Sequence, residues 1–122
     1  MTLLLYIWDS SGNTYPAYMV GSTITKIPTG SVSNGMVWWM NLSPTGDLFA
    51  TGMLGTWNSM QPPVYWLNWS IRTLPTTSGQ PYGFPGGAAF SGGHVYIDGC
   101  TNDLKGFQSA VIWIDEKLNV LG

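Results

Sequence analysis

The chain has 122 residues, of which 8% are charged and 14% are aromatic, and its formal net charge is −2. The four basic residues are scattered, which excludes the clustered basic surface that nucleic-acid binding needs. The only cysteine is Cys100, so no intrachain disulfide is possible, and no basic segment precedes the apolar N-terminal run as it would in a signal peptide. We expect no membrane insertion, and the location stays open, with a virion or extracellular setting as the hypothesis.

Short apolar runs bounded by turn residues follow one another along the chain, without the 3.6-residue periodicity of a helix. The first strand is predicted at 3–8 and ends at the turn residues 9–13, where Asp and Gly favour a hairpin. Further strands are predicted at residues 17–20, 36–42, 48–53, 64–67, 70–74, 87–90, 94–100, 111–114 and 117–121. The chain is therefore predicted to be all-β.

The sequence repeats itself. Residues 24–31 (ITKIPTGS) return as residues 71–78 (IRTLPTTS), an offset of 71 − 24 = 47 that is predicted to continue without a gap to the C-terminus. The same offset aligns three apolar stretches, AYMV from Ala17, VYWL from Val64 and VIWI from Val111. Periods of 40 to 50 residues with several short strands are typical of propeller blades.

The repeat divides a single all-β domain (1–122) into a partial unit (1–28) without its innermost strand and two full units (29–75 and 76–122). The chain holds about 2.6 units, fewer than the four or more blades of a closed propeller. A propeller built from it would have to be completed by oligomerisation.

The order of parts in each unit resembles kelch-type propeller repeats. The matching segments are 88–99 (AAFSGGHVYIDG), 111–115 (VIWID) and the Leu-Pro pair at 74–75. The resemblance implies four-stranded antiparallel blades. Kelch repeats usually end the second strand with two glycines, whereas this chain has Gly52 or Gly99 alone. An alternative alignment sets residues 4–9 against 111–115 and makes the N-terminus a hairpin of third and fourth strands.

The aromatic residues give the main binding hypothesis. Strict alternation would place Trp38, Met40 and Leu42 on one face of their strand, and Val37, Trp39 and Asn41 on the other. Trp57 and Trp69 have no aromatic counterpart one repeat later, where Leu104 and Glu116 stand. Such unique aromatics suit a ligand or partner contact, although core or subunit packing is the alternative. The predicted contact residues are Trp39, Trp57, Trp69 and Tyr82.

No catalytic residue, metal site or cofactor is predicted. His94 and Cys100 share a strand face but lie too far apart for a thiolate and its base. Asp98, Asn102 and Asp103 match no calcium-binding spacing and are predicted to stabilise loop turns. The acid pair Asp115-Glu116 has no counterpart one repeat earlier, which predicts a solvated turn.

Few charges and many aromatics predict that part of the aromatic surface lies in an interface with another subunit or a ligand. The first hypothesis is a non-enzymatic structural or binding subunit of a homo-oligomer or larger particle, such as a viral tail, fibre or capsid accessory component. The alternative is a carbohydrate-binding lectin with aromatic pockets between repeats, in which several copies provide avidity. Self-association is expected in the first case, and other structural proteins or glycans are the further candidate partners.

Overall fold

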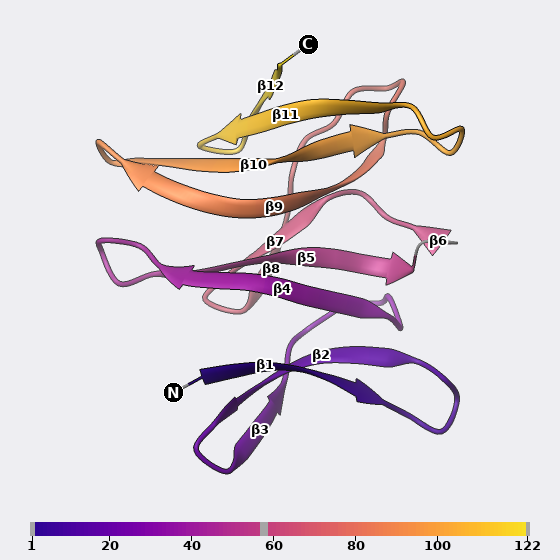
Figure 1. Cartoon of the computed structure of the whole chain (residues 1–122), viewed down its shortest axis with the longest axis vertical. Coiled ribbons are helices and arrows are strands. Elements are labelled where there is room, and N and C mark those ends of the chain that lie inside the picture. Colours follow the sequence, from indigo (N-terminus) through magenta and orange to yellow (C-terminus); the bar gives the residue numbers. More distant parts are fainter. Residues whose placement is uncertain (1, 57–58, 122) are drawn as a thin grey trace.

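The computed structural model describes residues 2–56 and 59–121, and these residues form three antiparallel sheets stacked one on another (Figure 1). The predicted all-β class is confirmed. The described residues form no helix, so none of them belongs to a helix long and apolar enough to cross a membrane. The first and third sheets are the two ends of the stack, and the chain termini lie at these opposite ends.

The first sheet contains three consecutive strands joined by hairpins, β1 (Thr2–Trp8), β2 (Thr14–Val20) and β3 (Thr23–Lys26). Strands β2 and β3 precede β7 (Val64–Leu67) and β8 (Ser70–Thr73) of the second sheet by 47 residues. Strand β1 therefore occupies the second position of its unit. The alternative alignment, which made the N-terminus a hairpin of third and fourth strands, is wrong.

The second and third sheets share one strand order. The second sheet runs β4-β5-β7-β8, and the short strand β6 (Ser59–Met60) pairs with β5. The third sheet runs β9-β10-β11-β12. Their remaining bounds are β4 (Gly35–Leu42), β5 (Leu48–Thr56), β9 (Tyr82–Ser91), β10 (His94–Asn102), β11 (Gln108–Ile114) and β12 (Lys117–Val120).

The structural repeat departs from a constant offset along one strand, because equivalent residues of β4 and β9 are 48 apart and not 47. Leu48 and Val95 are 47 residues apart, but their strand partners Leu42 and Phe90 are 48 apart. Between these equivalent pairs the second sheet has five residues (43–47) and the third sheet has four (91–94). The prediction of an ungapped repeat is wrong here, because a surface turn can change length without disturbing the strands it joins.

A β-bulge in the first strand of each full unit changes which side chains face the neighbouring sheets. Trp38 is the extra residue in β4, and Gly86 is the extra residue in β9. Consequently Val37 and Met40 both pack toward the first sheet, whereas Trp39 packs toward the third. The predicted alternation across residues 37–42 is wrong because the bulge adds a residue to the pattern.

Strand β9 begins at Tyr82, five residues before the predicted start at Gly87. The additional segment contains Gly83, Pro85 and Gly86, residue types that are uncommon inside strands. Strand β9 forms one edge of its sheet and carries the bulge, and both circumstances allow proline and glycine within a strand.

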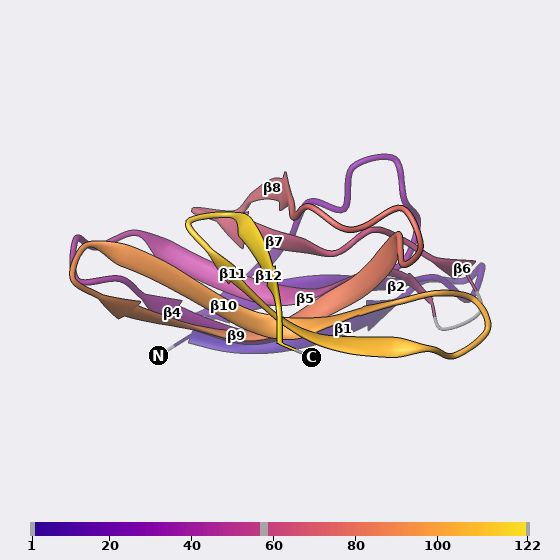
Figure 2. The ribbon, with the colours of Figure 1, turned by 90° about the horizontal axis from the view of Figure 1, so that it is seen from above.

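Two hydrophobic cores hold the stack together, one at each junction between sheets. The first core lies between the first and second sheets and contains Ile27, Val37, Ala50, Leu54, Val64 and Trp66. The second core lies between the second and third sheets and contains Phe49, Tyr65, Leu74, Ile97, Val111 and Trp113. The middle sheet is covered on both faces, whereas each end sheet is covered on one face (Figures 1 and 2).

Candidate binding surfaces

One tryptophan at each junction between sheets donates a hydrogen bond from its indole to the preceding unit. The Trp66 indole donates a hydrogen bond to the Pro28 carbonyl oxygen at 2.8 Å, and Trp113 donates to the Pro75 carbonyl oxygen at 2.9 Å. Both indoles are fully buried, and both proline carbonyls end the preceding unit. A buried indole N–H requires such a partner, so the same contact fixes the position of each sheet on the one before it.

A second repeated contact links the edges of the sheets. Tyr18 stacks on Trp69 with ring centroids 4.7 Å apart. One repeat later the equivalent pair is Tyr65 and Glu116, and the Tyr65 hydroxyl donates a hydrogen bond to the Glu116 carboxylate. Arg72 also donates to that carboxylate, at 2.6 Å. Residues 115 and 116 form the predicted turn, and Glu116 in addition takes part in an inter-sheet network.

This network shifts the acidity of its members. The Arg72 guanidinium and the Tyr65 hydroxyl hold the pKa of the Glu116 carboxyl below its ordinary value. Burial and the hydrogen bond to Glu116 raise the pKa of the Tyr65 phenol. Tyr65 is consequently a proton donor and Glu116 a charged acceptor at neutral pH.

We expect Tyr65→Phe to lower the free energy of unfolding by about 0.5–1.5 kcal/mol, because it removes one hydrogen bond and keeps the ring in the second core. Urea unfolding at pH 7 followed by tryptophan fluorescence measures this difference. An unchanged midpoint would show that the bond contributes nothing to the junction.

The Glu116→Gln variant tests the pH dependence of the same network. A carboxyl whose folded pKa is lowered contributes stability above its unfolded pKa and loses this contribution as the pH falls through the folded pKa. We therefore expect the wild type to be the more stable at pH 7 and its advantage to shrink below about pH 4.5, which is near the ordinary pKa of glutamate. A difference in thermal midpoint that stays constant from pH 7 to pH 3 would contradict the role assigned to Glu116.

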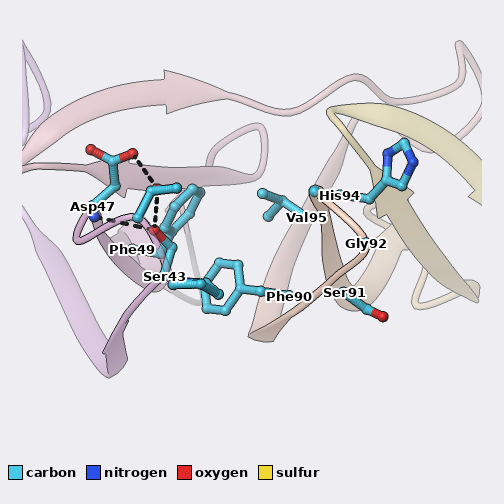
Figure 3. A pocket seen from close by; sticks show the side chains of 11 residues that line it. Ser43, Asp47, Phe49, Phe90, Ser91, Gly92, His94 and Val95 are labelled. Atoms are coloured by element: carbon cyan, nitrogen blue, oxygen red, sulfur yellow. Dashed lines mark hydrogen bonds between the residues drawn. The ribbon is translucent and has the colours of Figure 1, made fainter.

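A groove opens between the β4–β5 turn and the β9–β10 turn, at one edge of the junction between the second and third sheets (Figure 3). Its volume is about 380 Å³. Phe90 and Val95 extend from the third sheet toward Phe49 of the second, while the His94 ring points away from the groove (Figure 3). Ser43, Pro44, Thr45, Asp47 and residues 91–93 complete the lining.

A second groove of about 420 Å³ lies at the corresponding edge of the first junction. Three pairs of its lining residues are equivalent to those of the first groove, namely Thr2 with Phe49, Leu48 with Val95, and Leu42 with Phe90. It is also lined by Tyr18, Val20, Met40, Asn41 and Trp69. The repeat thus produces two related grooves, both with aromatic side chains in their walls.

The predicted contact residues do not form one site. Trp69 lines the groove at the first junction, whereas Trp39 packs against the second core and lines a separate hollow beside Gly87. Tyr82 begins β9 and pairs with Asn102 of β10, and Trp57 lies outside the described residues. Sequence reasoning missed Phe49 of β5 and Phe90 of β9. These residues lie in different sheets, and the stacking of the sheets places their ring centroids 5.1 Å apart.

The face of the first sheet that points away from the second sheet is apolar. Residues that lie opposite each other on paired strands point to the same face of the sheet. Leu3 of β1, Met19 of β2 and Ile24 of β3 are opposite each other and therefore share this face. We call this surface the back face, and it consists of Leu3, Leu5, Ile7, Met19 and Ile24, with Tyr15 and Lys26 at one end and the fully buried Ala17 beneath them. The Lys26 ammonium lies 4.5 Å from the centre of the Tyr15 ring.

The opposite end of the stack is apolar too. We call it the outer face, and by the same register rule it contains Tyr96, Cys100, Ala110, Ile112, Ile114, Asn119 and Leu121. Its charged residues are Asp98 and Lys117, and the Asp98 carboxylate accepts a hydrogen bond from the Gly87 amide at 2.9 Å. Leu121 is 64% exposed, although its equivalents Ile27 and Leu74 are 2% and 1% exposed. The difference arises because a further sheet covers Ile27 and Leu74 but not Leu121.

Polar groups that could perform chemistry are dispersed. In the described part of the chain, no group of three or more His, Cys, Asp or Glu side chains is placed to hold a metal ion. His94 pairs with the Asp115 carboxylate at 2.6 Å on an exposed turn, and burial raises the pKa of the Cys100 thiol, which disfavours the thiolate. Asp103 accepts hydrogen bonds from the amides of Lys105 and Phe107, as expected for a turn residue.

No family model matches the chain, and no curated protein and no solved structure is similar to it.

Proposed function

We propose that the protein is a non-enzymatic structural subunit of a homo-oligomer or larger particle, in which its sheets act as propeller-like blades. The observation that carries this proposal is the presence of an apolar face at each end of the stack. Large exposed apolar surfaces are typical of interaction sites in soluble proteins. The low charge of the chain suits the same role, because charged residues are depleted in the centres of interfaces.

Sedimentation velocity tests this function with a double variant, Ile24→Asp and Leu121→Asp, that places a charge on each end face. We expect the wild type to sediment as an oligomer and the double variant to sediment as one folded chain, because an unpaired charge in a buried interface is costly. Leu104→Asp is the matched control, since Leu104 is 74% exposed at the tip of the β10–β11 turn and outside the outer face. A wild type that sediments as one chain at every concentration would contradict the proposal.

A second candidate function is carbohydrate binding, and the pair of related grooves favours it. Each groove combines an apolar or aromatic wall with hydroxyl, amide or carboxylate groups at the rim, such as Asp47 in one and Asn41 in the other. A pyranose ring has an apolar C–H face and a rim of hydroxyls, which matches this arrangement.

Glycan-array binding tests the second function with Trp69→Ala and Phe90→Ala, one variant for each groove. If the grooves bind sugar, each variant loses part of the glycan signal and keeps the sedimentation coefficient of the wild type. Loss of assembly in these variants, or an array without any signal for the wild type, would assign both aromatics to packing alone.

A further inference from the structure

The back face and the outer face are each equivalent, by the repeat, to a face of the second sheet that packs on a neighbouring sheet inside the chain. Shifting the back-face residues by 47 gives the residues with which the second sheet faces the first. The pairs include Leu3 with Ala50, Met19 with Trp66 and Ile24 with Ile71. The back face thus has the position and apolar character of a surface that already receives a sheet.

The outer face has the complementary relation. Shifting Tyr96, Ile112 and Leu121 back by 47 gives Phe49, Tyr65 and Leu74. These three residues belong to the second core, where the second sheet receives the third. The outer face is therefore equivalent to a surface that receives the next sheet of the series.

Together the two relations specify a direction of assembly. If one further sheet were added to the outer face by the same repeat, it would present the equivalent of the back face. Within a chain this contact occurs twice, at the two hydrophobic cores. A second copy can continue the series with its first sheet, and this arrangement is head-to-tail because the two contacting faces differ.

We propose that the outer face of one copy docks on the back face of a second copy, with Leu121 covered as Ile27 and Leu74 are covered inside the chain. This inference rests on the proposed assembly function and adds the partner, the two surfaces and their polarity. A head-to-tail contact of this kind forms a ring if its rotation closes and a filament if it does not.

The contact differs from the internal junctions in one respect. At the position of Trp66 and Trp113 the first sheet has Met19, which carries no indole N–H. The hydrogen bond to the preceding unit is therefore absent from the intermolecular contact. We expect this contact to be weaker than either internal junction and to dissociate on dilution before the chain unfolds.

Mixing two single variants tests the polarity. Ile24→Asp blocks the back face and leaves the outer face intact, whereas Leu121→Asp does the opposite. In a head-to-tail assembly each variant alone is a single chain, because every contact needs one face of each kind. An equimolar mixture then forms a dimer of one chain of each variant, capped at both ends, which native mass spectrometry detects when one variant carries an isotope label.

The outcomes separate this inference from the proposed function. A wild-type oligomer together with a mixture that stays monomeric would overturn the head-to-tail contact and leave the assembly function standing. Association of Leu121→Asp with itself would also overturn it, since that result requires two back faces to meet. A monomeric wild type would overturn both. Far-UV circular dichroism of each variant and of the Leu104→Asp control verifies that the sheets are intact.

Discussion

Gly52→Ala is expected to abolish the native fold or to cost more than about 4 kcal/mol, a loss that few single substitutions reach. A Cβ atom at Gly52 would overlap the Met36 carbonyl oxygen and would lie 2.8 Å from the Val37 Cα. The β4 bulge places this backbone against β5, so a methyl group could be accommodated only by separating the two paired strands. Yield of soluble protein and, where the variant folds, urea unfolding measure the effect.

Gly79→Ala is the matched control for this substitution. No atom lies within 4 Å of a Cβ placed at Gly79, and its φ is not positive. We expect its stability to stay within about 0.5 kcal/mol of the wild type, as for most surface changes. Equal behaviour of the two glycine variants would contradict the close backbone contact at the bulge.

Trp113→Ala is expected to lower the free energy of unfolding by about 3–5 kcal/mol, the range for removing a buried large aromatic side chain. The indole is fully buried in the second core and donates a hydrogen bond to Pro75 of the preceding unit. Trp113→Phe is expected to lose less, because the ring still fills part of the space. Urea unfolding of both variants measures these losses.

Trp8→Ala provides the comparison, since Trp8 is 72% exposed. We expect a change within about 0.5 kcal/mol for this variant. A Trp113→Ala variant as stable as Trp8→Ala would mean that the third sheet is not fastened through its tryptophan.

The strand pattern and the repeat were largely predictable from the sequence. Alternation and turn residues located most strands, and the recurrence of 24–31 at 71–78 identified units that the structure shows as separate sheets. The order of the three strands of the first sheet follows from the same alignment, because residues 2–26 correspond to residues 49–73 of the second sheet. Local alternation and turn residues were sufficient to predict the strands, since a strand depends on neighbouring residues. The recurrence after 47 residues was sufficient to predict the units.

The bulges and the inter-sheet contacts were not predictable in the same way. Nothing in the sequence of β4 marks Trp38 as the extra residue, and its effect depends on the backbone of β5. The contact of Glu116 with Tyr65 and Arg72 joins residues 51 and 44 positions apart. The equivalent pair one repeat earlier is an aromatic stack, so the repeat conserves the place of the contact but not its chemistry.

The same distinction applies to the candidate sites. Unique aromatics identified Trp69, which does line a groove. They did not identify Phe49 and Phe90, which come from different sheets and meet only after the sheets are stacked. The residues of the end faces could in principle be predicted from the sequence, because shifting the core positions by one repeat leads to Leu121 and Met19. Such a prediction requires knowing which side of each sheet is covered, and this depends on how the sheets stack.

The native mass of the wild-type chain, measured over a range of concentrations, tests most directly whether the end faces are completed by other copies. One chain has a mass of 13.3 kDa. The account predicts a discrete multiple of this mass at higher concentration and release of folded single chains on dilution. A folded species of 13.3 kDa at every concentration would contradict it, because the back face and the outer face would then remain in water.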